Sequence, residues 1–324
     1  MPASARPIFI ATRGSALALA QARFILAKCR TAFPRRRFEL KILKTTGDKL
    51  QTASLASSSL PKGLFTKELE VALLKGDADL AVHSLKDLPT DLPAGLKLGA
   101  VTRRADARDV LLYRAATPDR NGPRGFQPHL GIRGLPRGAT VATSSTRRSA
   151  QLRERRPDLK IVPLRGNVGT RLRKLATQAE IDATILAAAG LARLHFKITR
   201  AGRLRGEGVP AGLFATLIEP EEMLPCVGQA ALGIEIRAGD ERLEKICAKL
   251  NHARTGHCVT AERAFLQALG GGCQLAVAAY AEIVGARLEV RAVSFLGKKA
   301  RRATARGTPA AAAALGRSLA ARLR

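Results

Sequence analysis

Residues 8–19 read Ile-Phe-Ile-Ala-Thr-Arg-Gly-Ser-Ala-Leu-Ala-Leu, an apolar run that stops at Arg13-Gly14-Ser15 and continues as a helical pattern. The same order of apolar run, polar turn and helical pattern recurs through the first two-thirds of the chain. Short apolar runs predict strands at residues 8–12, 38–45, 78–83, 140–143, 160–164 and 182–187. Helical patterns are expected at 15–31 and 65–75. Alternating strands and helices predict an α/β protein with a largely parallel sheet.

The last third of the chain has a different pattern. Its predicted elements are a helix at 257–269, strands at 276–283 and 287–295, and a helix in the Ala-rich tail 308–324. These elements indicate a separate α+β domain, with a glycine run at 270–272 between its first helix and its first strand. Two stretches rich in Pro, Gly and Arg, 118–138 and 200–212, are expected to be surface loops.

Composition excludes several classes of protein. The 324 residues suffice for two to three domains, and 46% hydrophobic residues supply real cores, so disorder of the whole chain is excluded. Aromatic residues make up only 4%, too few for a row of base-stacking platforms. Lys and Arg number 55 against 26 Asp and Glu, a formal charge of +29. Such an excess predicts an anionic partner.

Cysteine usage and hydropathy indicate the compartment. The five cysteines are odd in number, widely spaced and form no Cys-x-x-Cys pair, which favours a reducing compartment. Apart from Cys273, they are expected to be ordinary buried or surface thiols. The sequence has no apolar run of ~18 residues, and Arg13 interrupts the first apolar stretch, so we expect neither a membrane span nor a secretory signal. The expected protein is soluble and cytoplasmic.

Polar residues follow the predicted strands, at the sheet edge where open α/β sheets bind ligands. They are mostly cationic or small: Arg13, Ser84, Lys86, Ser145, Arg147, Arg148, Arg165 and, one helical turn later, Arg171. Arginine binds carboxylate or phosphate through two parallel hydrogen bonds, and helix N-termini attract anions. Any one of these arginines could equally be a surface charge. Together they predict an anion-binding crevice.

Three further residues carry alternatives that the sequence leaves open. Asp87 is the single acid in these segments; it either pairs with a nearby cation or stabilises a developing positive charge. His83 ends an apolar strand, which favours a buried side chain over a general base. Cys273 follows three glycines that leave its thiol accessible, so it is either a nucleophilic thiol or a free loop cysteine; no histidine lies nearer than His257, which does not support a Cys-His hydrolase. No zinc, P-loop or dinucleotide motif is present in the sequence, so no metal is expected.

Six segments in order show a family resemblance. They are ATRGSALAL at 11–19, KGLFTKELE at 62–70, AVHSLKDLP at 81–89, TSSTRR at 143–148, LRGNVGTR at 164–171 and GGCQ at 271–274. In this combination they resemble the porphobilinogen deaminase family over almost the whole chain. One such segment is weak support, whereas six in the same order are specific.

The resemblance implies three domains: residues 1–105 with 228–250, residues 106–227, and residues 251–324. The first two would be similar to type II periplasmic binding proteins, with the active site in the cleft between them. The cysteine matching Cys273 would hold a dipyrromethane cofactor through a thioether. Four porphobilinogen molecules would be condensed on this primer with loss of ammonia, and hydrolysis would release hydroxymethylbilane.

The resemblance also implies roles for single residues. Asp87 would contact pyrrole nitrogens and stabilise the cation formed when ammonia leaves, and Lys62 would belong to a lid. The acetate and propionate groups of the growing polypyrrole would be bound by Arg13, Ser84, Lys86, Ser145, Arg147, Arg148, Arg165, Arg171 and Arg193. Ala230 departs from the family pattern, in which glycine is common at this position, so the hinge between the first two domains is expected to be stiffer. The expected state is a monomer.

The charge of +29 exceeds what a carboxylate-binding cleft requires. Two alternatives therefore stay open at this stage. One is a basic nucleic-acid-binding protein, which predicts a steep salt dependence; the other is a catalytically silent ligand-binding protein on the same scaffold. Retention of both Asp87 and Cys273 argues against a silent protein, and the position of many basic residues in the insertions and tail argues against nucleic acid as the partner.

Overall fold

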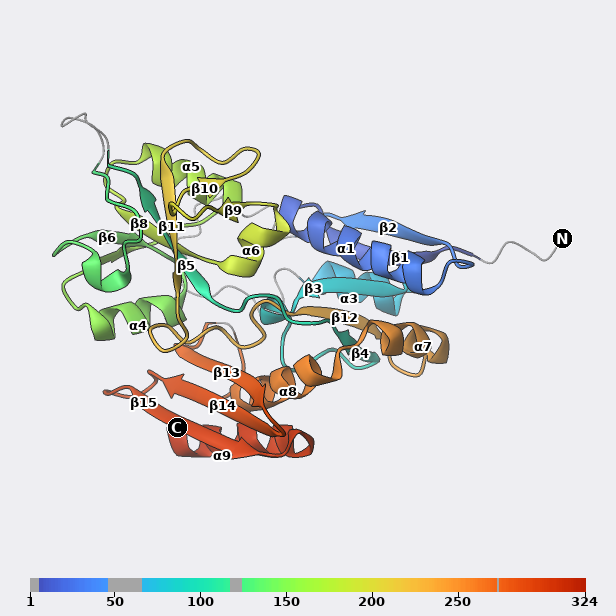
Figure 1. The fold of residues 1–324 in the computed structure, drawn as a ribbon. Coiled ribbons are helices and arrows are strands. Elements are labelled where there is room, and N and C mark those ends of the chain that lie inside the picture. Colours follow the sequence, from blue (N-terminus) through green and yellow to red (C-terminus); the bar gives the residue numbers. More distant parts are fainter. Residues whose placement is uncertain (1–5, 46–65, 117–123, 273) are drawn as a thin grey trace.

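The computed structural model describes residues 6–45, 66–116, 124–272 and 274–324 (Figure 1). In these ranges the chain forms two five-stranded sheets, one three-stranded sheet and a two-stranded hairpin. The two larger sheets lie side by side, and the third lies beneath them near the C-terminus (Figure 1). The α/β class predicted for the chain, with a smaller α+β part at its end, is confirmed.

The first sheet has the strand order β2-β1-β3-β12-β4. Its strands are β1 Ile8–Arg13, β2 Phe38–Leu43, β3 Leu80–Ser84, β4 Leu96–Val101 and β12 Leu232–Arg237. Helices α1 (Ala16–Ala32) and α7 (Glu241–Leu250) cover one face, and α3 (Lys67–Leu74) covers the other. Successive side chains of a strand point to opposite faces, so Ile10 packs against α1 and α7 whereas Ala11 packs against α3.

The second sheet has the order β11-β5-β8-β6-β7. Its strands are β5 Asp109–Arg114, β6 Thr140–Ala142, β7 Lys160–Val162, β8 Ala183–Ala187 and β11 Leu213–Ile218. Its helices are α4 Thr146–Arg155, α5 Val168–Thr177 and α6 Ala188–Arg193. Leu152 of α4 belongs to one core of this sheet with Tyr113, and Leu172 of α5 belongs to the other with Leu112. Strands of both sheets are thus buried on two faces.

Two crossovers connect these sheets. The chain leaves β4 through residues 102–108 and returns from β11 through residues 219–231, named here the first and the second crossover. They run next to each other (Figure 1). The Arg104 Nε donates to the Gln229 carbonyl at 2.8 Å, and the Gln229 Nε2 donates to the Ala107 carbonyl at 2.7 Å. Side-chain and backbone hydrogen bonds therefore join the two segments that link the sheets.

The third sheet is antiparallel, in the order β13-β14-β15, and packs on α8 and α9. The elements are α8 Ala253–Ala268, β13 Val277–Val284, β14 Arg287–Ser294, β15 Arg301–Gly307 and α9 Ala312–Leu323. Gly316 lets the two helices approach closely, because a Cβ there would lie 2.1 Å from the Ala261 carbonyl oxygen. The predicted helices and the first two strands are confirmed, and β15 is an additional strand.

The prediction of a largely parallel sheet is confirmed for most strands, because four strands of each larger sheet run in one direction, but one strand of each is reversed. In the first sheet β12 is antiparallel to β3 and β4, and in the second β5 is antiparallel to β8 and β11. Strand β5 follows the first crossover and β12 follows the second. At these two strands the chain enters the sheet at the end where the other strands of that sheet finish. The local apolar runs did not reveal this direction, which long-range pairing sets.

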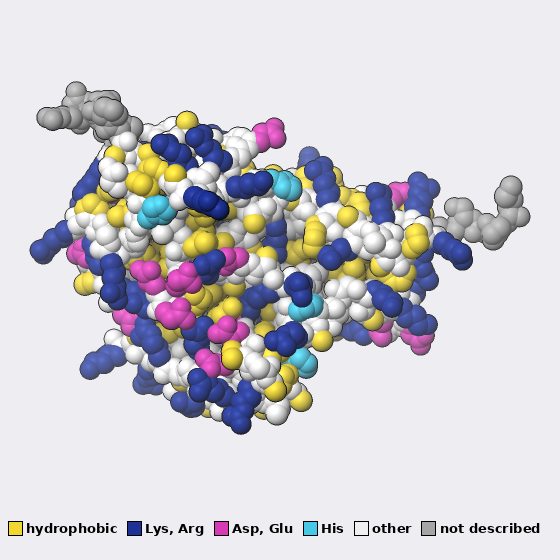
Figure 2. All heavy atoms as spheres, viewed as in Figure 1, with side chains coloured by type: hydrophobic (Ala, Val, Ile, Leu, Met, Phe, Trp, Pro, Cys, Tyr) yellow, Lys and Arg dark blue, Asp and Glu magenta, His cyan; other side chains and the backbone are white. Residues whose placement is uncertain are grey.

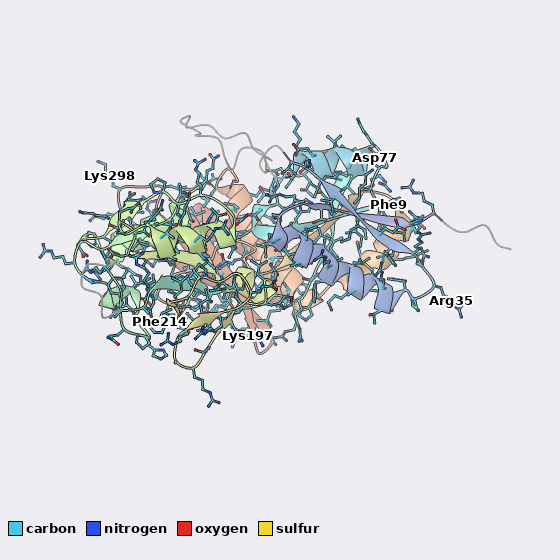
Figure 3. All side chains as sticks on the ribbon, turned by 90° about the horizontal axis from the view of Figure 1, so that it is seen from above. Phe9, Arg35, Asp77, Lys197, Phe214 and Lys298 are labelled. Carbon is cyan, nitrogen blue, oxygen red and sulfur yellow. The ribbon has the colours of Figure 1, made fainter. Side chains whose placement is uncertain are left out.

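The two predicted surface loops are more ordered than expected. Residues 117–123 lie outside the described residues, but Phe126, Ile132 and Leu135 are buried in the core of the second sheet. In the second stretch, β10 (Leu204–Arg205) pairs with β9 (Lys197–Ile198), and Leu204 is buried. The Arg203 guanidinium carbon lies 5.3 Å from the centre of the Phe214 ring, and Figure 3 shows where Phe214 and Lys197 lie. Short apolar anchors therefore attach both stretches to the second sheet.

Candidate active site

A small cavity lies at the carboxyl ends of β1 and β3, where the sequence predicts a ligand site. Its volume is about 60 Å³, and its polar lining consists of Arg13, Ser15, Gln21, Thr66, His83, Ser84 and Asp87. Two helices begin at it. Ser15 caps α1 by accepting a hydrogen bond from the Ala18 amide at 3.3 Å, and Thr66 precedes α3. Helix N-termini and Arg13 make this cavity, named here the Asp87 cavity, favourable for anions.

Strand β3 delivers Asp87 to the cavity. Ser84 at the end of β3 exchanges hydrogen bonds with the Gln21 amide, the shorter at 2.8 Å, and the chain then turns through a 3₁₀ segment, Leu85–Asp87. Asp87 is exposed, whereas Leu85 is buried. The second crossover packs on this turn, because a Cβ at Gly228 would lie 3.1 Å from the Leu85 side chain. The turn carrying Asp87 is thus fixed from both sides.

Lys86 interacts electrostatically with charged groups of both larger sheets. Burial lowers the pKa of Lys86; the positive charge of Arg148 adds to the lowering, and the carboxylates of Asp87 and Asp109 oppose it. The charged form of Lys86 is thus favoured by two acids, Asp87 beside the first sheet and Asp109 on β5 of the second sheet; these two sheets with their helices are named here the first and the second lobe. Lys86 therefore connects the Asp87 turn with the N-terminus of α4.

Arg147 and Arg148 are buried and share one carboxylate. The Arg147 Nη1 lies 2.7 Å from Asp109 Oδ2, and the Arg148 Nη2 lies 2.7 Å from Asp109 Oδ1. Burial alone would raise the pKa of Asp109, but the two guanidinium groups outweigh it and hold that pKa well below its usual range. Ser145 caps α4 by accepting from the Arg148 amide at 3.4 Å. The structure therefore gives both arginines an internal partner that sequence reasoning did not include.

Arg171 faces the same group of charges from α5. Its Nε donates to the Gly166 carbonyl at 2.8 Å. Burial lowers the pKa of Arg171 to about 10; Arg148 adds to the lowering, and Asp87 opposes it. The charges of Arg171 in the second lobe and Asp87 in the first thus act on each other. Arg165, in the loop between β7 and α5, is exposed.

Arg193 of α6 reaches the second crossover. Its Nη2 donates to the Ala230 carbonyl at 2.7 Å, and burial lowers the pKa of Arg193 to about 10. Ala230 has a φ of +71°, a left-handed conformation that glycine adopts without strain. The structure thus places Arg193 at the second crossover, where the hinge is expected.

The structure brings Arg13, Ser84 and Asp87 to one cavity and Lys86, Arg148 and Arg171 to its surroundings.

Lys62 and Cys273 lie outside the described residues, but the neighbours of Cys273 are anchored at the site. The Gly270–Gly272 backbone has positive φ angles, and a Cβ at Gly271 would lie 2.8 Å from the Thr90 Oγ1, three residues beyond Asp87. On the other flank, the Thr146 hydroxyl at the start of α4 donates to the Leu275 carbonyl at 3.3 Å. The chain on either side of position 273 therefore contacts both lobes.

Sequence reasoning missed four residues of this region: Gln21, Asp109, Cys226 and Gln229. Asp109 is the first residue of the apolar strand β5, and an acid at the start of such a strand is the signal that could have drawn attention to it. Gln229 is buried and donates to Asp109 Oδ1 at 3.1 Å. His83 is buried, as expected, and its Nε2 lies 3.0 Å from the Glu235 carboxylate.

Two negative findings apply to the described residues only. They contain no cluster of three or more His, Cys, Asp or Glu side chains suited to a metal ion. No helix among them is both long and apolar enough to cross a bilayer.

Two family models and several known proteins match the sequence. The family model described as "Porphobilinogen deaminase, dipyromethane cofactor binding domain" matches residues 8–245, and the model of the porphobilinogen deaminase C-terminal domain matches residues 257–324. The porphobilinogen deaminase of Syntrophus aciditrophicus is 47% identical, covering 87% of this chain and 83% of the relative. Those of Moorella thermoacetica and Syntrophobacter fumaroxidans are 44% and 41% identical, covering 98% and 97% of this chain and 92% and 93% of the relatives.

Solved structures show more distant likenesses. The BenM effector-binding domain with benzoate is 17% identical, with a TM-score of 0.41, covering 75% of this chain and 90% of that chain. A Corynebacterium glutamicum OxyR mutant is 13% identical, with a TM-score of 0.40, covering 80% and 67%.

The two family models and these relatives define the class of the protein, a transferase with a dipyrromethane cofactor. The chain belongs to the porphobilinogen deaminase family. It condenses four porphobilinogen molecules head to tail, with loss of ammonia, on a bound dipyrromethane primer and releases hydroxymethylbilane. The nucleic-acid-binding and silent ligand-binding alternatives are not supported.

Proposed function

We propose that Asp87 is the catalytic carboxylate of this transferase and that the cations around it hold the carboxylates of the substrate and the primer. The observation that carries this proposal is the position of Asp87. It is an exposed acid at the mouth of a cavity lined by Arg13, and it interacts electrostatically with Lys86 and Arg171.

The chemistry of Asp87 follows from charge. A pyrrole N–H directed at its carboxylate donates a charge-assisted hydrogen bond, and the same carboxylate stabilises positive charge that develops on the pyrrole as ammonia leaves. After the α-carbon of the terminal ring attacks this cation, it loses one proton; the released ammonia takes up a proton, so each condensation yields one ammonium ion. Asp87 is fixed for this task by the Gly228 contact and by the Gln21–Ser84 pair.

The proposed carboxylate-binding residues act in two ways. In this proposal the acetate and propionate groups are contacted directly by Arg13, Ser84, Lys86, Arg165 and Arg171. Arg147 and Arg148 already share Asp109, so they contribute charge and the N-terminus of α4, capped by Ser145, rather than mobile side chains. We propose that Arg193 couples carboxylate binding to the hinge through the Ala230 carbonyl.

The residues fit a dipyrromethane group, which bears four carboxylates and would be held at Cys273. The fit rests on the anchored flanks of position 273 and on the excess of cations at the site. The Gln267 Nε2 donates to Asp91 Oδ1 at 2.6 Å, and Arg263 donates to the Leu88 and Pro89 carbonyls, so α8 is tied to the segment after Asp87. When bound, this group supplies the α-carbon on which the first porphobilinogen is added.

We further propose the domain limits 1–105 with 228–250, 106–227 and 251–324, a monomer, a cytoplasmic location and a lid that includes Lys62.

We also propose that nucleic acid is not a partner. Basic side chains are scattered over the face shown in Figure 2, and the acids there gather between the second and third sheets. On this face the dispersed charge lacks the single stripe typical of a nucleic-acid-binding surface.

The test of the catalytic assignment is a comparison of Asp87→Asn with Asp77→Asn. Asp77 is an exposed acid beside Lys41, so its amide variant controls for the loss of one surface charge. We expect Asp87→Asn to lower kcat by ~10²–10³-fold with an unchanged melting temperature, and Asp77→Asn to retain activity. An Asp87→Asn enzyme with kcat within a few-fold of the parent would refute the assignment.

A further inference from the structure

A second cavity lies between the second lobe and the third sheet, and we name it the α4–β15 cavity. Its volume is about 520 Å³, within the ~300–1,000 Å³ typical of small-molecule sites. Its walls come from α4, from the second crossover, and from β14, β15 and α9. Among the described residues, none lines both this cavity and the Asp87 cavity. The α4–β15 cavity is therefore separate from the proposed catalytic site.

Hydrogen bonds of the chain itself hold the walls of this cavity. The Leu224 amide donates to Gln151 Oε1 at 2.8 Å, and Gln151 Nε2 donates back to the Leu224 carbonyl at 3.1 Å, which ties the second crossover to α4. On the opposite wall, Arg291 of β14 lies directly across from Thr304 of β15. Because residues two apart in a strand share a face, Arg302 lies on the same side of the sheet as Thr304.

The polar lining of the cavity is mainly cationic. Its charged residues are Arg155, Arg291, Arg302, Arg322 and Glu221. Arg291 pairs with Glu221, and its Nη2 also lies 3.1 Å from Glu282 Oε1. Arg302 pairs with Glu154 of α4, with Nη1 2.6 Å from Oε1. Two of the four arginines are thus neutralised by acids of the chain.

The other two, Arg155 and Arg322, have no carboxylate partner among the described residues. The Arg155 Nη2 donates to the Glu221 carbonyl at 2.6 Å, and the Arg322 Nη1 donates to the Thr304 carbonyl at 3.1 Å. The Arg155 Nε is buried and has no hydrogen-bond acceptor in the part of the chain that the structure describes. A buried donor without an acceptor is costly, so this guanidinium group has bonding capacity to spare.

We propose that the α4–β15 cavity binds a small organic dicarboxylate, with one carboxylate on Arg155 and the other on Arg322. The guanidinium group suits a carboxylate because it can form two parallel hydrogen bonds with it. A small rotation of Arg155 toward the ligand gives its Nε an acceptor. The apolar part of the lining, which receives the body of the ligand, consists of Pro220, Leu224, Ala292 and Ala303.

The size of the cavity favours an organic anion over an inorganic one. A water molecule takes up ~30 Å³, so the cavity holds several times the volume of a phosphate ion. The bound ligand joins α4 of the second lobe to β15 and α9 of the third domain. This site goes beyond the proposed function and does not rest on it.

The experiment is isothermal titration calorimetry of the holoenzyme with benzene-1,3-dicarboxylate, with benzoate and inorganic phosphate as comparison ligands. Arg155→Gln and Arg322→Gln each remove one proposed contact. Arg153→Gln and Arg317→Gln are the matched controls on the same two helices, because both side chains are exposed and lie outside the cavity lining. Thr304→Glu keeps every arginine and adds a carboxylate at an exposed position of the wall, so it tests the site without removing a hydrogen bond of the fold.

We expect the parent and the two control variants to bind the dicarboxylate at least ~10-fold more tightly than they bind benzoate or phosphate. Arg155→Gln, Arg322→Gln and Thr304→Glu should each weaken this binding by at least ~10-fold. Absence of binding to the parent up to ~10 mM, or an unchanged affinity in any of these three variants, would overturn the proposal. Phosphate that binds as tightly as the dicarboxylate would overturn the assignment to an organic ligand.

A further variant, Arg13→Gln, separates the two cavities. It should bind the dicarboxylate as the parent does, because Arg13 lines the Asp87 cavity and not this one. Loss of binding in Arg13→Gln would place the ligand in the Asp87 cavity and overturn the proposal. None of these titrations uses turnover, so a failure here leaves the catalytic assignment of Asp87 to its own test.

Discussion

Asp109→Asn is the substitution that most directly tests how the second lobe holds its arginines. In the parent, Asp109 Oδ1 accepts from Arg148 and Gln229, and Oδ2 pairs with Arg147. The amide keeps the shape of the side chain but removes its charge, and its NH₂ group faces a guanidinium donor. Two buried positive charges then have no counter-ion.

Removal of one partner from a buried ion pair costs about 3–5 kcal/mol. At ~2–4 °C per kcal/mol, the melting temperature of the transition that includes the second sheet should fall by about 6–20 °C. The matched control is Asp106→Asn, three residues earlier, where an exposed Asp pairs with Arg108 at 2.7 Å. An exposed pair contributes ~0.2–1 kcal/mol, so that variant should lose only a few degrees.

The assay is differential scanning calorimetry of both variants at pH 7, followed by porphobilinogen turnover at a temperature where both are folded. The pKa of Asp109 is held low, so its stabilisation is present above the ordinary Asp value of ~3.9 and is lost as the pH falls through the folded value. The parent and Asp109→Asn should therefore converge in strong acid. If Asp109→Asn loses no more than Asp106→Asn at pH 7, the buried triad does not have the role assigned to it.

Three further predictions concern the hinge, the first sheet and the cofactor loop. Ala230→Gly relieves a left-handed alanine and should raise the melting temperature by the equivalent of ~0.5–1 kcal/mol; a lower melting temperature would contradict this. Burial raises the pKa of Glu70, so its stabilisation is present below the unfolded value of ~4.3 and is lost as the pH rises through the folded value. Glu70→Gln should therefore be more stable than the parent at pH 7, and the gain should vanish below about pH 4 in urea titrations. In Gly271→Ala a Cβ would meet the Thr90 Oγ1 at 2.8 Å, so less of the purified chain should carry the cofactor by intact mass; unchanged loading would argue against that contact.

Much of the site was predictable because it depends on local order along the chain. Arg13 and the Ser84–Asp87 turn directly follow apolar runs, and the ends of parallel strands meet at one sheet edge, so their proximity follows from the sequence pattern. The expectation of covalent attachment at Cys273 came only from the family resemblance, since a glycine run before a cysteine is equally compatible with a free loop thiol.

The remainder depends on long-range pairing that the local pattern does not contain. Asp109 meets Arg148 only because β5 pairs antiparallel with β8 and α4 begins beside them. Asp87 is the single acid of the segments that follow the predicted strands, but a second acid neutralised by two arginines, Asp109, lies near them in the fold. Likewise, β12 is in the first sheet only because the second crossover returns the chain there.

The central claim is that the chain builds a polypyrrole on a primer attached to its own Cys273. The most direct measurement is the intact mass of the purified protein beside Cys273→Ser, before and after porphobilinogen is added. The parent should be heavier than its sequence by a dipyrromethane unit and should gain successive pyrrole increments, while Cys273→Ser shows neither. A parent that keeps its bare sequence mass, even after incubation with porphobilinogen, would contradict the account.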